Sequence, residues 1–195
     1  DATHPTLRSN MARFDCVART ALQQSLSLRY VRPTTMFTLR GLRHDFFHTV
    51  QGRVENASSL LPWESTAVAT DAHSWTWSLA VAQQLWQSSS TRGTLRGVVQ
   101  TLFRMPSFNE NYYHHYGNAN LRPERTQQFS VGLSVESRPT SSTFVWQGSV
   151  DVYHNRVLDR ILGIPANQTV WRTTNLDRVR AVGVDLSGHI WAQCA

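Results

Sequence analysis

The feature that most constrains this chain is an alternation of apolar and polar residues with a period of two. Around its middle, Trp75, Trp77 and Leu79 alternate with small polar residues. Such alternation is typical of a β-strand with one apolar and one polar face. The pattern predicts strands over residues 20–31, 36–46, 73–86, 93–104, 126–136, 143–155 and 178–191. Because no stretch shows a sustained helical stripe, we predict an all-β, antiparallel fold.

The connections between these strands alternate between short and long. Short turns are expected at 32–35, 87–92 and 137–141, and long connections at 47–72, 105–125 and 156–177. An outer-membrane β-barrel alternates in this way because its periplasmic turns are tight and its extracellular loops are extended. The strands have roughly 11–14 residues, enough for a tilted crossing of a bilayer. The pattern therefore favours a transmembrane β-barrel.

Seven strands are too few for such a barrel, and an unclosed sheet leaves its edge backbone groups unpaired in lipid. We therefore expect a partial barrel, an internal piece of a larger protein. The polar face would line the wet lumen, and tryptophans such as Trp75, Trp77 and Trp86 would lie near the lipid interfaces. The alternative is a soluble β-sandwich carbohydrate-binding module that uses its exposed tryptophans, with the polar face in solvent.

Composition excludes several other classes of protein. With 41% apolar residues the chain is not disordered, and no apolar run is long enough for a transmembrane helix. The net charge is +6 and every cation is arginine, but the arginines are spread singly, so no nucleic-acid partner is expected. We assign them to the lumen and the loops. Catalytic and phosphate-binding motifs are absent, so neither an enzyme, a cofactor nor a metal site is predicted.

Three motifs carry a family resemblance. Residues 103–113 read FRMPSFNENYY, residues 116–124 read YGNANLRPE, and residues 151–161 read DVYHNRVLDRI. Their order and spacing resemble the late barrel strands of TonB-dependent outer-membrane receptors, over about residues 73–191. Asn111, Ala119 and Arg122 depart from the usual leucine, proline and lysine. The nearest branch is the cobalamin-receptor-like group that is common in Bacteroidetes.

The resemblance implies a fold and a function. Residues 1–195 would be about seven meander strands of a 22-stranded C-terminal β-barrel domain, without the N-terminal plug domain and the final strands. The whole protein would be a receptor in the bacterial outer membrane that actively transports cobalamin, a siderophore or haem. Its partners would be the nutrient ligand, outer-membrane lipid and the TonB complex, which would supply energy through the missing plug.

Two sets of residues are candidates for the functional site. The family motif, expected to be structural and to include an ion pair at the barrel rim, comprises Phe103, Arg104, Pro106, Gly117, Asn118, Leu121, Pro123 and Glu124. The candidates for ligand contact in an extracellular loop are Tyr112, Tyr113, His114, His115 and Tyr116. Tyrosines can stack on a planar ligand, and histidine can bind haem iron. The alternative for this patch is an aromatic interface belt with two solvated histidines.

Overall fold

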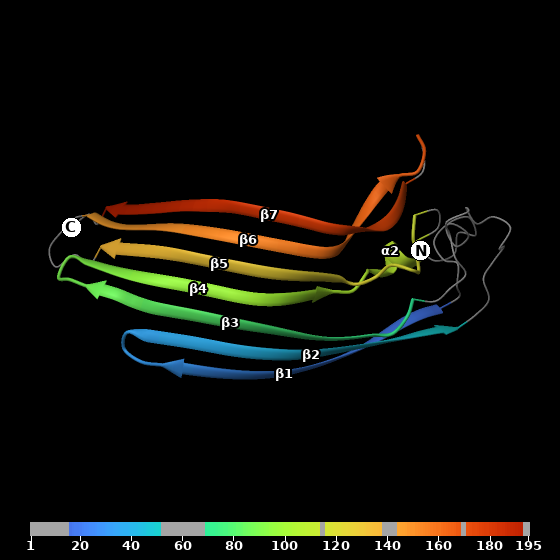
Figure 1. The fold of residues 1–195 in the computed structure, drawn as a ribbon, viewed down its shortest axis with the longest axis horizontal. Helices are drawn as coiled ribbons and strands as arrows, with labels where there is room; N and C mark the ends of the chain where they lie inside the picture. The colour runs from blue at the N-terminus through green and yellow to red at the C-terminus, as the bar shows by residue number, and fades with distance from the viewer. Residues whose placement is uncertain (1–15, 52–68, 114–115, 138–143, 169–170, 193–195) are drawn as a thin grey trace.

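The computed structural model describes residues 16–51, 69–113, 116–137, 144–168 and 171–192. These residues form one antiparallel sheet whose strands follow one another in sequence order (Figure 1). The strands are β1 (Cys16–Val31), β2 (Thr35–Gln51), β3 (Ala72–Gln87), β4 (Thr91–Arg104), β5 (Glu124–Ser137), β6 (Phe144–Pro165) and β7 (Trp171–Ala192), and a short helix, α2, spans Phe108–Tyr112. The predicted all-β antiparallel meander of seven strands, a partial barrel, is confirmed.

The connections define two ends of the sheet. Residues 32–34, 88–90 and 138–143 link strands at one end, which we call the turn end. Residues 52–71 and 105–123 link strands at the opposite end, the loop end. Among the described residues, no helix is long and apolar enough to cross a membrane.

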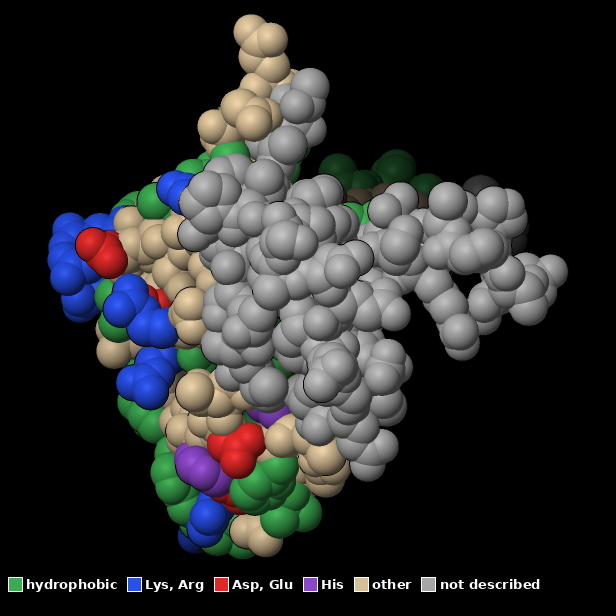
Figure 2. Space-filling model, turned by 90° about the vertical axis from the view of Figure 1, so that its right-hand side faces the viewer, with side chains coloured by type: hydrophobic (Ala, Val, Ile, Leu, Met, Phe, Trp, Pro, Cys, Tyr) green, Lys and Arg blue, Asp and Glu red, His purple; other side chains and the backbone are tan. Residues whose placement is uncertain are grey.

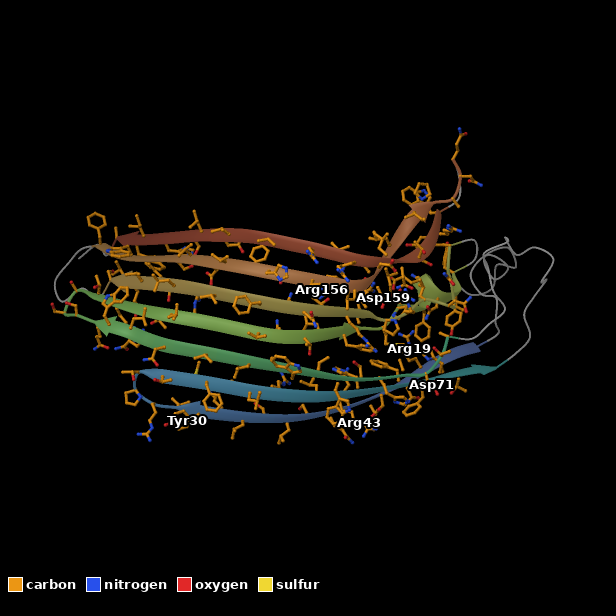
Figure 3. The ribbon with its side chains drawn as sticks, viewed as in Figure 1. Arg19, Tyr30, Arg43, Asp71, Arg156 and Asp159 are labelled. Carbon is orange, nitrogen blue, oxygen red and sulfur yellow. The ribbon has the colours of Figure 1, made fainter. Side chains whose placement is uncertain are left out.

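The predicted long connection at 156–177 is wrong. The β6–β7 ladder continues from the pair Arg160 and Leu176 to the pair Pro165 and Trp171, so both strands extend well beyond the predicted limits. Asp159 has a φ of 54°, a left-handed conformation that is uncommon for a residue with a side chain. It lies where the β6–β7 hairpin bends away from the sheet (Figures 1 and 3). Beyond this bend one face of the hairpin packs on residues 105–123, but that face includes Gly163 and Thr173, so the sequence shows no apolar period of two there.

The apolar residues share one face of the sheet. Leu28, Leu39, Leu79, Val99, Phe129, His154 and Val182 form one continuous row of directly paired residues across all the strands. This apolar face is exposed: Leu26 keeps 80% of its accessible surface and Leu186 keeps 79%. Because no second described layer covers this face, the sheet is not half of a β-sandwich core.

The position of the apolar residues shifts from strand to strand. On β1 they are centred near Leu26, two residues toward the loop end from the row of Leu28, and on β7 near Leu186, four residues toward the turn end from Val182. A shift of about 20 Å over six strand spacings of about 4.8 Å each corresponds to a strand tilt of about 35°. Transmembrane barrels have tilts of about 35–45°. The apolar residues thus form the slanted belt that a level bilayer requires.

A β-bulge keeps Trp86 in this belt. The β3–β4 register shifts between Gln84 and Trp86, and Trp86 pairs with Gly93. A Cβ atom on Gly93 would overlap the Trp86 ring. The extra residue, Leu85, returns the following side chain to the apolar face, as bulges do when they redirect a strand.

The opposite face is polar and hydrogen-bonded. Arg96 of β4 lies 3.1 Å from Asp151 of β6, and Gln100 Nε2 donates to Gln128 Oε1 at 2.6 Å. Gly132 of β5 pairs with Arg96 of β4 on one side and with Asp151 of β6 on the other, and a Cβ atom on Gly132 would overlap the Asp151 carboxylate. This face therefore has the character predicted for a wet lumen.

Candidate functional site

The packed part of the molecule lies at the loop end, around the segment that connects β4 to β5. The buried hydrophobic residues of the described chain are Ala69, Tyr112, Ala119, Leu121 and Ile161. We call residues 105–123, which include α2, the loop-end segment. It reaches across the sheet: the Arg19 guanidinium of β1 lies 4.8 Å from the Phe108 ring, and Thr173 of β7 donates to the carbonyl of Tyr116 at 3.0 Å. One loop thus contacts the first and the last described strands.

Helix α2 begins with a capping box. Ser107 Oγ accepts a hydrogen bond from the Glu110 N–H at 3.2 Å, and the Glu110 carboxylate accepts one from the Ser107 N–H at 2.7 Å. The preceding Pro106 is fully buried and has no N–H to satisfy. Our sequence prediction missed this helix, although a serine followed three residues later by glutamate is its recognised start signal.

The predicted ion pair between Arg104 and Glu124 is present and is part of a larger network. Arg104 donates to both carboxylate oxygens of Glu124, at 3.0 and 2.9 Å, and to Glu110 at 3.1 Å. Glu124 is buried, and it also accepts from the Ile161 N–H at 2.7 Å and lies 3.4 Å from Arg160. The network joins the end of β4, the start of β5, α2 and β6.

This network also affects the ionisation of Glu110. Partial burial disfavours the charged carboxylate, but hydrogen bonds from Arg104 and from the Ser107 N–H oppose it and prevail. Together they hold the pKa of the Glu110 carboxyl below its ordinary value. Glu110 is therefore an anion at neutral pH, which keeps it attached to Arg104.

Gly117 is required by space rather than by an unusual backbone conformation. Its N–H donates to the Tyr113 carbonyl at 2.7 Å, which folds the chain back against α2. A Cβ atom on Gly117 would lie 2.7 Å from the backbone nitrogens of Tyr112 and Tyr113.

Because Asp159 is the only described residue with a side chain at positive φ, Asn118 has no left-handed conformation either. Its side chain instead accepts from the Asn120 N–H at 2.9 Å and donates to the Thr173 carbonyl at 3.3 Å.

Asn175 of β7 also fixes the loop-end segment, although it was not predicted as a site residue. Asn175 of β7 accepts from the Arg122 N–H and donates to the Arg122 carbonyl, each at 2.9 Å. Its amide also donates to the Asp159 carbonyl at 2.8 Å, and Arg122 lies 2.6 Å from the Asp159 carboxylate. The sequence gives no signal for this contact beyond the family resemblance, because its partners are 53 residues apart.

The structure separates the members of the aromatic patch. The Tyr112 ring is buried, and its hydroxyl accepts from the Ala69 N–H at 3.0 Å. Tyr116 packs over Gly163, where a Cβ would lie 2.9 Å from the Tyr116 hydroxyl. Tyr113 keeps 40% of its surface, and His114 and His115 lie outside the described residues. Ligand contact by this patch stays a prediction, and among its described members Tyr113 is the accessible one.

The remaining motif residues support the rim. Leu121 is buried, Pro123 immediately precedes the first residue of β5, and the Phe103 ring lies 5.9 Å from the rings of His44 and Phe46 on β2. Among the described residues, no group of three histidine, cysteine or acidic side chains converges on a possible metal position.

The sequence and the fold of this chain are both similar to those of one class of known proteins. A family model described as TonB dependent receptor-like, beta-barrel, matches residues 39–192. The chain is 30% identical over 87 residues to the vitamin B12 transporter BtuB of Vibrio vulnificus, which is 44% of this chain and 13% of that protein. A solved structure of a double mutant of the Serratia marcescens hemophore receptor HasR, in complex with its hemophore HasA and heme, aligns with a TM-score of 0.65 and 14% identity. The alignment covers 93% of this chain and 33% of HasR, so the chain spans a minor part of both relatives.

Proposed function

This chain belongs to the TonB-dependent receptor-like β-barrel family, and we propose from that premise that the whole protein is an outer-membrane receptor that imports a scarce nutrient. The observation that carries the proposal is the slanted, exposed apolar belt on one face of the sheet, with a hydrogen-bonded polar face behind it. A soluble protein rarely exposes so continuous an apolar surface. A bilayer covers it, and the polar face lines a lumen.

We propose that the nutrient is a cobalamin, a siderophore or haem, taken up with energy from the TonB complex. The similarity to a protein named as a vitamin B12 transporter supports the first of these. The plug domain through which TonB would act, and the remaining strands, are proposed to lie in the rest of the protein. The loop-end segment contributes a rigid floor for the extracellular loops, since Phe108 contacts β1, Arg122 pairs with Asp159 of β6, and Tyr116 accepts from Thr173 of β7.

In this proposal the ligand contacts Tyr113 and the histidines that follow it, rather than the buried Tyr112. Tyr113 is exposed on the loop-end segment and directly precedes His114 and His115 in the sequence. An exposed tyrosine ring offers a flat face to a planar macrocycle. A neighbouring histidine can serve as an axial ligand of a metal in that macrocycle.

The test is uptake by the full-length protein. We would express it in a host that lacks its own receptors and measure uptake of cobalamin, haem and a ferric siderophore, with and without TonB. Uptake of one of them that disappears without TonB is the expected result. Uptake that persists without TonB, or no binding of any of the three by the purified protein, would contradict the proposal. Haem binding that is lost in His114→Ala or His115→Ala would assign haem instead of cobalamin.

A further inference from the structure

Two arginines face each other on the apolar side of the sheet. Arg156 of β6 pairs directly with Arg180 of β7, one row from the pair of His154 and Val182. Like charges directly opposite on one sheet face repel and destabilise the pairing. In the next row toward the loop end, Leu158 lies between Arg125 of β5 and Arg178 of β7. We call Arg125, Arg156, Arg178 and Arg180 the arginine patch. The sequence-based assignment of the arginines to lumen and loops is wrong for these four.

None of the four arginines of the patch forms an ion pair within the part of the chain that the structure describes. No ion pair or hydrogen bond involves its four side chains, and Arg156 Nε is buried without a partner. The nearest carboxylates in sequence lie beside other arginines: Glu124 beside Arg104 and Arg160, and Asp159 and Asp177 beside Arg122. Two other arginines of the sheet do have a carboxylate partner: Arg43, on the apolar face of β2, lies 2.9 Å from Asp45, and Arg96, on the polar face, lies 3.1 Å from Asp151. The four arginines of the patch thus lack the carboxylate partner that Arg43 and Arg96 have.

The patch borders the apolar belt on its loop-end side. Phe129 and Val182, at the edge of the belt, are exposed by 49% and 71%. Figure 2, which looks onto the loop end, shows basic side chains along one edge of the molecule, with acidic and hydrophobic ones among them, and Figure 3 marks Arg156 on β6. In a bilayer that covers the belt, arginines at this level meet the headgroup layer, to which long cationic side chains extend.

We propose that the arginine patch binds the phosphate groups of lipid headgroups in the outer leaflet of the outer membrane, an inference that rests on the proposed function. A guanidinium binds phosphate through two parallel hydrogen bonds, so a phosphate placed between Arg156 and Arg180 relieves their repulsion. A lipid satisfies both surfaces at once, because its phosphate meets the patch while its acyl chains cover the belt. A soluble anion would leave the belt uncovered.

The test is a titration of the full-length protein, purified in a neutral detergent, with lipid A that carries two phosphates. Bound lipid is counted by native mass spectrometry. Each cation near an anionic headgroup contributes about fivefold in affinity, so Arg156→Gln with Arg180→Gln should weaken binding roughly 25-fold. Arg156→Lys with Arg180→Lys keeps the charge and should retain most of the affinity. Dephosphorylated lipid A should bind the wild type as weakly as the glutamine variant binds the phosphorylated lipid.

The matched control is Arg29→Gln with Arg40→Gln. These arginines alternate with Leu28 and Leu39 and therefore lie on the polar face, so the control removes the same charge from the other side. An equal loss in the control, wild-type affinity in the Arg156/Arg180 variant, or equal binding of dephosphorylated lipid A would overturn the proposal. Displacement of the lipid by equimolar inorganic pyrophosphate would also overturn it, in favour of a soluble anion. Because the readout is lipid binding, it stays decisive even if the protein imports none of the proposed nutrients.

Discussion

Arg104 and Glu124 are directly opposite each other at the loop end of the β4–β5 ladder, and Arg104 Nη2 lies 2.9 Å from the Glu124 carboxylate. The same ladder has a second arginine–glutamate pair near its turn end, Arg92 with Glu136. The two pairs differ in burial: the Glu124 side chain is 4% exposed, whereas that of Glu136 is 36% exposed. One ladder therefore contains two ion pairs with similarly exposed arginines, one with a buried carboxylate and one with a more exposed carboxylate.

This contrast predicts different costs of removal. Arg104→Ala leaves the buried Glu124 carboxylate with only the Ile161 N–H and Arg160, and should cost about 1–3 kcal/mol of unfolding free energy. Arg92→Ala should cost less than about 1 kcal/mol, because solvent screens an exposed pair. Denaturant unfolding of the full-length protein in detergent measures both. Equal effects of the two substitutions would show that burial of Glu124 has no energetic role.

Gly117→Ala should destabilise the loop-end segment. The added methyl group would contact backbone atoms of Tyr112 and Tyr113, which cannot move without disturbing α2. Overpacking of this kind costs about 1–3 kcal/mol. Gly41→Ala is the matched control, because nothing lies within 4 Å of a Cβ at Gly41. Hydrogen exchange of the loop-end segment should rise in the Gly117 variant alone, and unchanged exchange there would contradict the packing argument.

Glu110 should make the stability of the loop end depend on pH. Its pKa is lowered in the folded protein, so its contribution is present above the ordinary carboxyl value of about 4.3 and is lost as the pH falls through the folded pKa. At neutral pH, Glu110→Gln should be less stable than the wild type by about 0.5–1 kcal/mol. The difference should shrink as the pH falls below the ordinary carboxyl value and should vanish once Glu110 is protonated in the folded protein as well. Unfolding of both proteins from neutral to acidic pH measures this difference in stability. A difference that grows in acid would contradict a lowered pKa of Glu110 in the folded protein.

The two neighbouring tyrosines should separate stability from ligand binding. Tyr112→Phe removes the hydroxyl that accepts from the Ala69 N–H and should cost about 1 kcal/mol of stability without altering ligand affinity. Tyr113→Ala should leave stability nearly unchanged and weaken binding about 2- to 10-fold, the range expected for loss of one aromatic contact. Calorimetric titration with the transported ligand distinguishes them. A loss of ligand affinity in Tyr112→Phe and not in Tyr113→Ala would show that the ligand contacts Tyr112 instead.

Much of the fold was predictable because strand periodicity is a local property. Trp75, Trp77 and Leu79 share a face for geometric reasons that do not depend on their partners. The limits of β6 and β7 were not predictable, since the face of the hairpin that packs on the loop-end segment beyond Asp159 includes Gly163 and Thr173 and shows no apolar alternation. The capping box at Ser107 was visible in the sequence, but a helix of five residues has no detectable apolar stripe.

The sequence by itself determined the strands, their two faces and the family, because alternation and ordered motifs are written in neighbouring residues. Tertiary structure alone decided which distant residues meet. The contacts of Thr173 with Tyr116, of Asn175 with Arg122 and of Arg156 with Arg180 depend on register and on the path of a long loop. The bulge at Leu85 changes the face on which the next residue lies. Register is a property of paired strands, so it becomes definite only when the partners have come together.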